Sequence, residues 1–308
     1  MKRGALIALV CIFACSAEPK PAPEDPTDEV HVTYAETVDR LVSRFLHEGQ
    51  VVSRDDDGSP QHRGDSLLWT GMALGVLPCD RIADVESALG ANVEANGGHV
   101  VRFMPLPEEY RGGREASLDG ELGLLWGVAQ YAKRCGTYPA WFATHYAALA
   151  ANGWVYPGAA RLHPEFSYVL DVIAHGAGLR GRPDPRRGVL LGAEVAAWAA
   201  ATKAAQAAAY RIHLGWLALS AVEAAGEEIG EARAMYCAAT DGAGMPLVNE
   251  WCGKSGLADW LSTFQFDAYE YALQRGPWES QDGRPGLSTP ALDRLVALTQ
   301  LYNLGGNQ

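Results

Sequence analysis

The sequence is poor in basic residues. It holds 25 lysine and arginine residues against 37 aspartate and glutamate residues, a formal net charge of −12. Nucleic acids and anionic membrane surfaces are polyanions, so this balance disfavours both as partners. A local group of arginines can still hold an anionic glycan. We therefore expect no nucleic-acid partner.

Several catalytic signatures are also missing. The sequence has no G-x-S-x-G elbow, no Walker P-loop, no H-E-x-x-H, and no G-x-G-x-x-G after a predicted strand. The acidic run from Asp55 to Asp57 lacks the spacing of a calcium-binding loop. These absences disfavour a serine hydrolase, an NTPase, a dehydrogenase and a zinc protease. We expect no cofactor and no bound metal.

The first 16 residues, MKRGALIALVCIFACS, indicate export. A basic head of Lys2 and Arg3 precedes an apolar run of 11 residues, which suits the core of a signal peptide and is too short to span a bilayer. The run ends in Ile12-Phe13-Ala14-Cys15, which resembles a bacterial lipobox. Residues 1–14 are therefore predicted to be a lipoprotein signal peptide, and Cys15 to receive lipid. An ordinary signal peptide that contains cysteine is the alternative.

Residues 15–32 are predicted to form a disordered tether. This stretch is rich in proline and acidic residues, and it has too little apolar surface to offset the entropy of ordering. Ser16, rather than aspartate, follows the lipidated cysteine, which resembles the sorting signal for the outer membrane. No later segment has 18 uninterrupted apolar residues. We expect a cell-envelope protein that contacts the outer membrane through the lipid on Cys15.

Four cysteines remain after the anchor: Cys79, Cys135, Cys237 and Cys252. An even number in an oxidising compartment favours disulfides. Three pairings are possible. The most local set, Cys79–Cys135 with Cys237–Cys252, is favoured, while the other pairings and free thiols stay open.

Residues 33–308 are predicted to form one all-α domain, because apolar residues recur there at helical spacing. Helices are expected over residues 34–49, 65–77, 81–96, 117–133, 140–152, 164–174, 189–225 with a break near 209–210, 228–239, 256–275 and 289–301. Strand signals are nearly absent, and 99–103 is the best strand candidate. Uniformly apolar helices alternate with amphipathic ones, as in an α/α toroid of helical hairpins. An irregular helical bundle is the alternative.

Two polar clusters precede the most apolar helices and form the candidate site. Paired carboxylates at such positions can act as general acid and base, and arginines can hold a substrate. The candidate catalytic residues are Asp65, Asp119 and Glu121. The candidate substrate-binding residues are Arg63, His99, Arg102, Arg114 and Trp154. Helix capping is the competing interpretation of Asp65 and Asp119.

The tryptophans divide into two groups by position. Some lie near loops or helix ends, where an indole ring can stack on a sugar: Trp141, Trp154, Trp251 and Trp278. Others lie within apolar helices, where packing in the core is expected: Trp69, Trp126, Trp198 and Trp216.

Three segments, DSLLWTG at 65–71, GHVVR at 98–102 and SLDGELGLLW at 117–126, resemble a pattern in secreted bacterial proteins. More broadly, the alternation of apolar helices and polar loops is similar to α/α-toroid, six-hairpin-glycosidase-like proteins that act on polysaccharides. That resemblance implies a helical ring and a glycan as ligand.

Two functions are consistent with these features. The first is a non-catalytic, lipid-anchored envelope protein whose helical domain binds a polysaccharide or an envelope protein. The second is a polysaccharide hydrolase or lyase that uses paired carboxylates.

Overall fold

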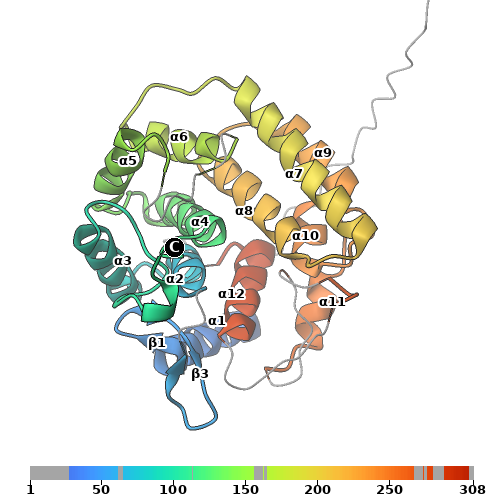
Figure 1. The fold of residues 1–308 in the computed structure, drawn as a ribbon. Helices are drawn as coiled ribbons and strands as arrows, with labels where there is room; N and C mark the ends of the chain where they lie inside the picture. The colour runs from blue at the N-terminus through green and yellow to red at the C-terminus, as the bar shows by residue number, and fades with distance from the viewer. Residues whose placement is uncertain are drawn as a thin grey trace, which may run out of the picture.

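The computed structural model describes residues 28–61, 65–112, 114–155, 162, 165–266, 273, 276–279 and 288–304. Within these ranges the fold is all-α, as predicted, with twelve α-helices and four two-residue strands (Figure 1). None of these helices is long and apolar enough to cross a membrane. The predicted signal peptide, Cys15 and Arg63 lie outside the described residues.

The helices follow one another with short connections. Their bounds are α1 Asp28–Arg40, α2 Ser66–Val76, α3 Ala83–Ala95, α4 Leu118–Cys135, α5 Phe142–Ala151, α6 Ser167–Gly176, α7 Arg186–Ala205, α8 Tyr210–Ala224, α9 Gly230–Thr240, α10 Pro246–Trp251, α11 Leu257–Ser262 and α12 Thr289–Tyr302. A π-helical turn, Leu41–Phe45, continues α1, and a 3₁₀ turn, Glu108–Tyr110, precedes α4. The strands form two antiparallel pairs: β1 Leu46–His47 with β2 Gln50–Val51, and β3 Ser53–Arg54 with β4 Pro60–Gln61.

The first helix differs from its prediction at both ends. It begins at Asp28, so residues 28–32 of the predicted tether are helical. Asp28 and Glu29 lie in its first turn, where acidic side chains complement the helix dipole. Helical structure ends at Phe45 rather than residue 49, because Gly49, with φ of 75°, lies in the turn of the β1–β2 hairpin.

The predicted strand at 99–103 is wrong. The segment is an irregular loop whose backbone is paired with a side chain instead of a neighbouring strand. The Asn92 amide donates to the Val101 carbonyl at 2.8 Å, and the Val101 N–H donates to Asn92 Oδ1 at 3.0 Å. One asparagine thus satisfies both backbone groups of Val101, while the Arg102 N–H donates to the Glu115 carbonyl and the Arg102 carbonyl accepts from the Leu67 N–H.

Two C-terminal helices also differ from the prediction. The helix expected over 256–275 is α11, which ends at Ser262, and the chain turns at Thr263. The sequence did not predict α10, because six residues are too few to establish a helical period. Its start signal, a proline in the first turn at Pro246, is nevertheless present.

Helix α4 shows why the longer helices begin and end where they do. The Ser117 hydroxyl accepts from the Gly120 N–H at 3.2 Å and caps the N-terminus. Gly136 ends the helix in the left-handed conformation, with φ of 71°. Lys133 and Arg134 lie in the last turn, where cations complement the dipole.

Glycines let α2 and α4 pack with their backbones in contact. A Cβ on Gly123 would lie 2.8 Å from the Leu68 carbonyl oxygen, and one on Gly127 would overlap the Gly71 carbonyl. Every residue of α2 is buried. The two helices therefore form the tightest part of the core.

The buried helices lie inside the amphipathic ones. Figure 1 shows α2, α4, α8 and α12 near the centre of the molecule, with α3, α5 and α7 outside them. The last helix, α12, packs on α1 and α2, and α4 packs on both α6 and α8. These contacts suit a closed array of helical hairpins. The α/α toroid stays a prediction about this array, and a helical bundle stays its alternative.

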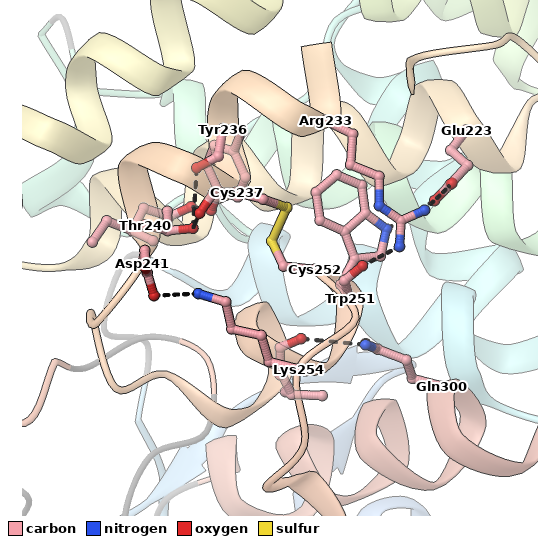
Figure 2. The surroundings of a disulfide bond; sticks show 12 residues. Glu223, Arg233, Tyr236, Cys237, Thr240, Asp241, Trp251, Cys252, Lys254 and Gln300 are labelled. Carbon is pink, nitrogen blue, oxygen red and sulfur yellow. Dashed lines mark hydrogen bonds and ion pairs between the residues drawn. A yellow bond between two sulfur atoms is a disulfide. The ribbon is translucent and has the colours of Figure 1, made fainter. Parts of the chain in front are cut away.

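Two disulfides join neighbouring helices, and they are the favoured pairing. Cys79, just after α2, is bonded to Cys135 at the end of α4. Cys237 of α9 is bonded to Cys252, which follows α10 (Figure 2).

Candidate functional site

Glu121 lies in the first turn of α4 and is completely buried. Its Oε1 is 2.9 Å from Nε2 of His145 on α5, which is also completely buried. The other nitrogen of that ring, Nδ1, donates to the Gly98 carbonyl at 2.8 Å. Both ring nitrogens thus face acceptors, which favours the imidazolium form. His145 carries no signal in the sequence, because a lone histidine in an apolar helix has no distinctive spacing.

The charge on this pair follows from its surroundings. Burial acts to lower the pKa of His145, but the Glu121 carboxylate and the Gly98 carbonyl outweigh burial and raise that pKa above its usual value. The second carboxylate oxygen of Glu121, Oε2, has no hydrogen-bond partner in the described part of the chain. The pair is therefore an enclosed ion pair, sealed from the surface by α4, α5 and the loop after α3.

His99 lies next to this ion pair. Its Nε2 accepts from the Asn152 amide at 2.6 Å, which places the proton of a neutral ring on Nδ1. Burial and the neighbouring charge of His145 lower the pKa of His99, and Glu121 opposes this only in part. His99 is thus neutral and only 7% exposed. Trp154 follows two residues after Asn152 and packs against Tyr146, with ring centroids 6.1 Å apart.

Asp65, Arg102 and Arg114 meet at the N-terminus of α2. Asp65 occupies the N-cap position, but its side chain makes no capping hydrogen bond. Instead, its Oδ1 is 4.0 Å from the Arg102 guanidinium. Arg102 also donates from Nε to the Arg114 carbonyl at 2.8 Å and lies over the Tyr110 ring. The Arg114 side chain is exposed. Through these contacts Arg102 joins the N-terminus of α2, at Asp65, to the segment around Arg114 that precedes α4.

Asp119 occupies different surroundings from Glu121. It lines an open pocket of about 480 Å³ between the N-terminal ends of α4 and α8. The aromatic side chains of Trp198 and Tyr210 and the guanidinium of Arg211 line the same pocket. Tyr210 is 49% exposed, so its ring is accessible to a ligand. Trp198 is half-buried and packs against the core, with its ring centroid 5.1 Å from that of Phe166, so the core position predicted for it is met in part. Tyr210 and Arg211 have no sequence signal as site residues.

The structure therefore separates the three candidate carboxylates. Glu121 is enclosed with His145, Asp65 faces Arg102, and Asp119 faces a pocket. In the described ranges, no group of three or more histidine, cysteine, aspartate or glutamate side chains is arranged to hold a metal ion.

No family model, curated protein or solved structure matches this chain. Its function has to be inferred from its own side chains.

Proposed function

We propose that the chain is a lipid-anchored protein of the bacterial cell envelope, attached to the outer membrane through Cys15. The basic head, the short apolar run and the lipobox-like residues before Cys15 support this. The two disulfides further support an oxidising compartment.

Metabolic labelling with a radioactive fatty acid tests the anchor. Cys15→Ala is expected to abolish labelling and release the protein from the outer-membrane fraction. Cys11→Ala is the matched control, because Cys11 lies within the apolar run and is removed with the signal peptide. Label that persists in Cys15→Ala would exclude lipidation at this residue.

We further propose that the helical domain binds a glycan without cleaving it, at the pocket lined by Asp119. The observation that carries this proposal is the composition of that pocket, in which Trp198 and Tyr210 lie beside Asp119 and Arg211. Aromatic rings offer flat apolar faces to a sugar ring. A carboxylate and a guanidinium offer charge-assisted hydrogen bonds to its hydroxyl groups.

Hydrolysis needs a second carboxylate. Glycosidases of both stereochemical types place two carboxyl groups about 5 to 9.5 Å apart around the bond that is cleaved. Asp119 is the one carboxylate among the described residues that line this pocket. Glu121 is buried and paired with His145, which argues against its acting as the second carboxylate. Binding is therefore favoured over a hydrolase or lyase that uses paired carboxylates.

The test measures binding and turnover together. The full chain is titrated with oligosaccharides prepared from the cell envelope, and new reducing or unsaturated ends are assayed in the same samples. Asp119→Asn removes a charge-assisted hydrogen bond and Tyr210→Ala removes an aromatic face, and each is expected to weaken binding about tenfold or more, which corresponds to about 1.4 kcal/mol. No new chain ends are expected.

Asp259→Asn is the matched control, since Asp259 is an exposed aspartate in the first turn of α11. It should bind as the wild type does. Equal weakening in the control would refute the pocket. New chain ends that disappear in Asp119→Asn would instead support the hydrolase or lyase alternative.

A further inference from the structure

A groove between α3 and α5 is open to the surface. It has a volume of about 680 Å³ and is lined by one side of α3, by the loop after α3, and by residues at the start of α5. The pocket lined by Asp119 lies instead between α4 and α8, and the described residues that line it are different ones. The groove and the Asp119 pocket are therefore distinct sites.

Small residues keep this groove open. More than half of its lining consists of glycine, alanine and serine: Ala83, Ser87, Gly90, Gly97, Gly98 and Ala140. A Cβ on Gly98 would lie 2.5 Å from the Ala148 Cβ, so the loop after α3 approaches α5 closely only because this residue is glycine. Short side chains leave space between the two helices that another chain can enter.

Two glutamates of α3, Glu86 and Glu94, are the charged members of the described lining. They are eight residues apart, which separates their Cα atoms by about 12 Å along the helix. Glu86 accepts from the Tyr131 hydroxyl at 3.3 Å, and within the described ranges neither carboxylate pairs with a cation. Glu94 is exposed and Glu86 is half-buried, so both can be reached from solvent.

The cations behind the groove do not neutralise these glutamates. The His145 imidazolium donates to the carbonyl of Gly98, but its charge is balanced by Glu121. Lys133 and Arg134, at the end of α4, line a separate cavity beside α8 and α12. Arg134 donates there to the last carbonyls of α2, at 2.6 and 3.0 Å. The lining of the groove therefore carries two negative charges and favours a cationic ligand.

An aromatic side chain lies between the two carboxylates. Gly90 is midway between Glu86 and Glu94 on α3, and a Cβ at this position would lie 3.1 Å from Cδ1 of Trp141. Trp141 is partly exposed, whereas its N–H is buried, so the ring offers apolar surface and no hydrogen bond. Lysine and arginine combine an apolar stem with a cationic end, and an indole ring also attracts cations.

We propose that this groove binds a basic segment of a partner protein, with two lysine or arginine side chains paired to Glu86 and Glu94 and an apolar stem on Trp141. A second copy of the chain is a poor occupant, because it brings the same carboxylates and a formal net charge of −12. An anionic glycan would be repelled by the same two carboxylates. The inference goes beyond the glycan binding proposed above and does not depend on it, since the residues of the two sites differ.

A synthetic peptide tests the groove. The probe is a fluorescein-labelled alanine peptide with lysine at every fourth position. Its lysines recur about 12 Å apart in a helix, at positions i and i+8, and about 13 Å apart in an extended chain, at positions i and i+4. The peptide therefore spans the two carboxylates in either conformation.

Fluorescence anisotropy is measured while the full chain is added to the peptide. Saturable binding is expected at an ionic strength of about 0.01 M, and weaker binding at about 0.1 M, because salt screens exposed charges. The same peptide with glutamine in place of lysine is expected not to bind. Absence of saturable binding by the lysine peptide overturns the proposal, as does equal binding of the glutamine peptide.

Two double variants separate the groove from the net charge of the protein. Glu86→Gln with Glu94→Gln is expected to weaken binding of the lysine peptide about tenfold or more, because two charge-assisted contacts are lost. Glu228→Gln with Glu231→Gln is the matched control, since both glutamates are exposed, lie outside the groove and carry the same charge. Equal weakening by the two double variants would show attraction to net charge alone and would overturn the proposal.

A cation introduced into the groove gives an independent test. Thr144 lines the groove and is exposed, so Thr144→Lys is expected to weaken binding of the lysine peptide about tenfold. Ala150→Lys adds the same charge at an exposed position of α5 outside the groove and should change binding less than about twofold. The melting temperature of each variant confirms that it is folded. Chitotriose binding that Thr144→Lys abolishes, without binding of the lysine peptide, would assign the groove to a glycan and overturn the proposal.

Discussion

His213 makes the stability of this protein depend on pH. It lies in the first turn of α8, is 2% exposed, and its Nε2 has no partner in the described part of the chain. Burial lowers its pKa to about 3. An unfolded histidine has a pKa of about 6.5, so the unfolded state binds one more proton than the folded state between these two values. Stability is therefore lost as the pH falls below about 6.5.

The size of this loss follows from the linkage relation. One proton corresponds to about 1.4 kcal/mol per pH unit, so His213 should cost about 2 kcal/mol between pH 7.5 and pH 5. His213→Leu removes that contribution. At pH 7.5 the variant should be at least as stable as the wild type, because it also removes a buried nitrogen without a partner.

Urea unfolding at pH 7.5 and at pH 5 measures both proteins. Other histidines also titrate: the lowered pKa of His99 adds an effect of the same sign. The raised pKa of His145 adds one of the opposite sign, since its stabilisation is present at low pH and is lost as the pH rises through the folded-state pKa. Only the difference between the wild type and His213→Leu is therefore diagnostic.

The expected difference between the two proteins changes by about 2 kcal/mol between the two pH values. Parallel behaviour, with a change below about 0.5 kcal/mol, would refute the assignment of a buried, neutral His213. His31→Leu on α1 serves as the control for the loss of one imidazole. An equal change in that control would show that burial of His213 is not the cause.

Three further perturbations test the packing. Gly127→Ala should lower the free energy of urea unfolding by about 3 kcal/mol or more, because the new Cβ would overlap the Gly71 carbonyl. Gly230 has open space around it, so Gly230→Ala is the control and should change stability by less than about 1 kcal/mol. Glu121→Gln should cost about 1–3 kcal/mol at neutral pH, because the charge-assisted hydrogen bond to His145 is lost and burial then favours the neutral ring; an unchanged urea midpoint would contradict the ion pair. Replacing Cys79 and Cys135 with serine should lower the free energy of unfolding by about 4 kcal/mol, because their disulfide closes a loop with a sequence separation of 56 residues. An unchanged urea midpoint would argue against this stabilisation.

Most of the helices can be predicted from the sequence, because the apolar periodicity and the end signals of each helix lie within its own residues. Periodicity placed α2, α3, α4, α5 and α12 within a few residues of their observed ends. Ser117 and Gly136 mark the ends of α4 by their own conformations. The valines at positions 100 and 101 favour a strand, but the backbone of residues 99–103 bonds to the Asn92 side chain and to the single residues Leu67, Asn96 and Glu115 rather than to a neighbouring strand.

The candidate site was predicted only in part, because spacing indicates which face of a helix is buried but not which helices are neighbours. Asp119 and Glu121 are two residues apart and were grouped together, yet one lines a pocket and the other pairs with His145. The apolar helices of Trp126 and Trp216 predict that both lie in the core, and both are buried there. Their contact with each other depends on the packing of α4 on α8, which is a property of the assembled fold.

The contact of α12 with α1 and α2 also affects the order in which the protein folds. Synthesis begins at the N-terminus, so α1 and α2 emerge long before the helix that packs on them. Their apolar surfaces stay partly uncovered until residues 289–302 have been made. Contacts between such distant parts of a chain slow folding, and exposed apolar surfaces favour aggregation. Completion of the fold therefore waits for the last helix, and a truncation before residue 289 leaves the first two helices without their cover.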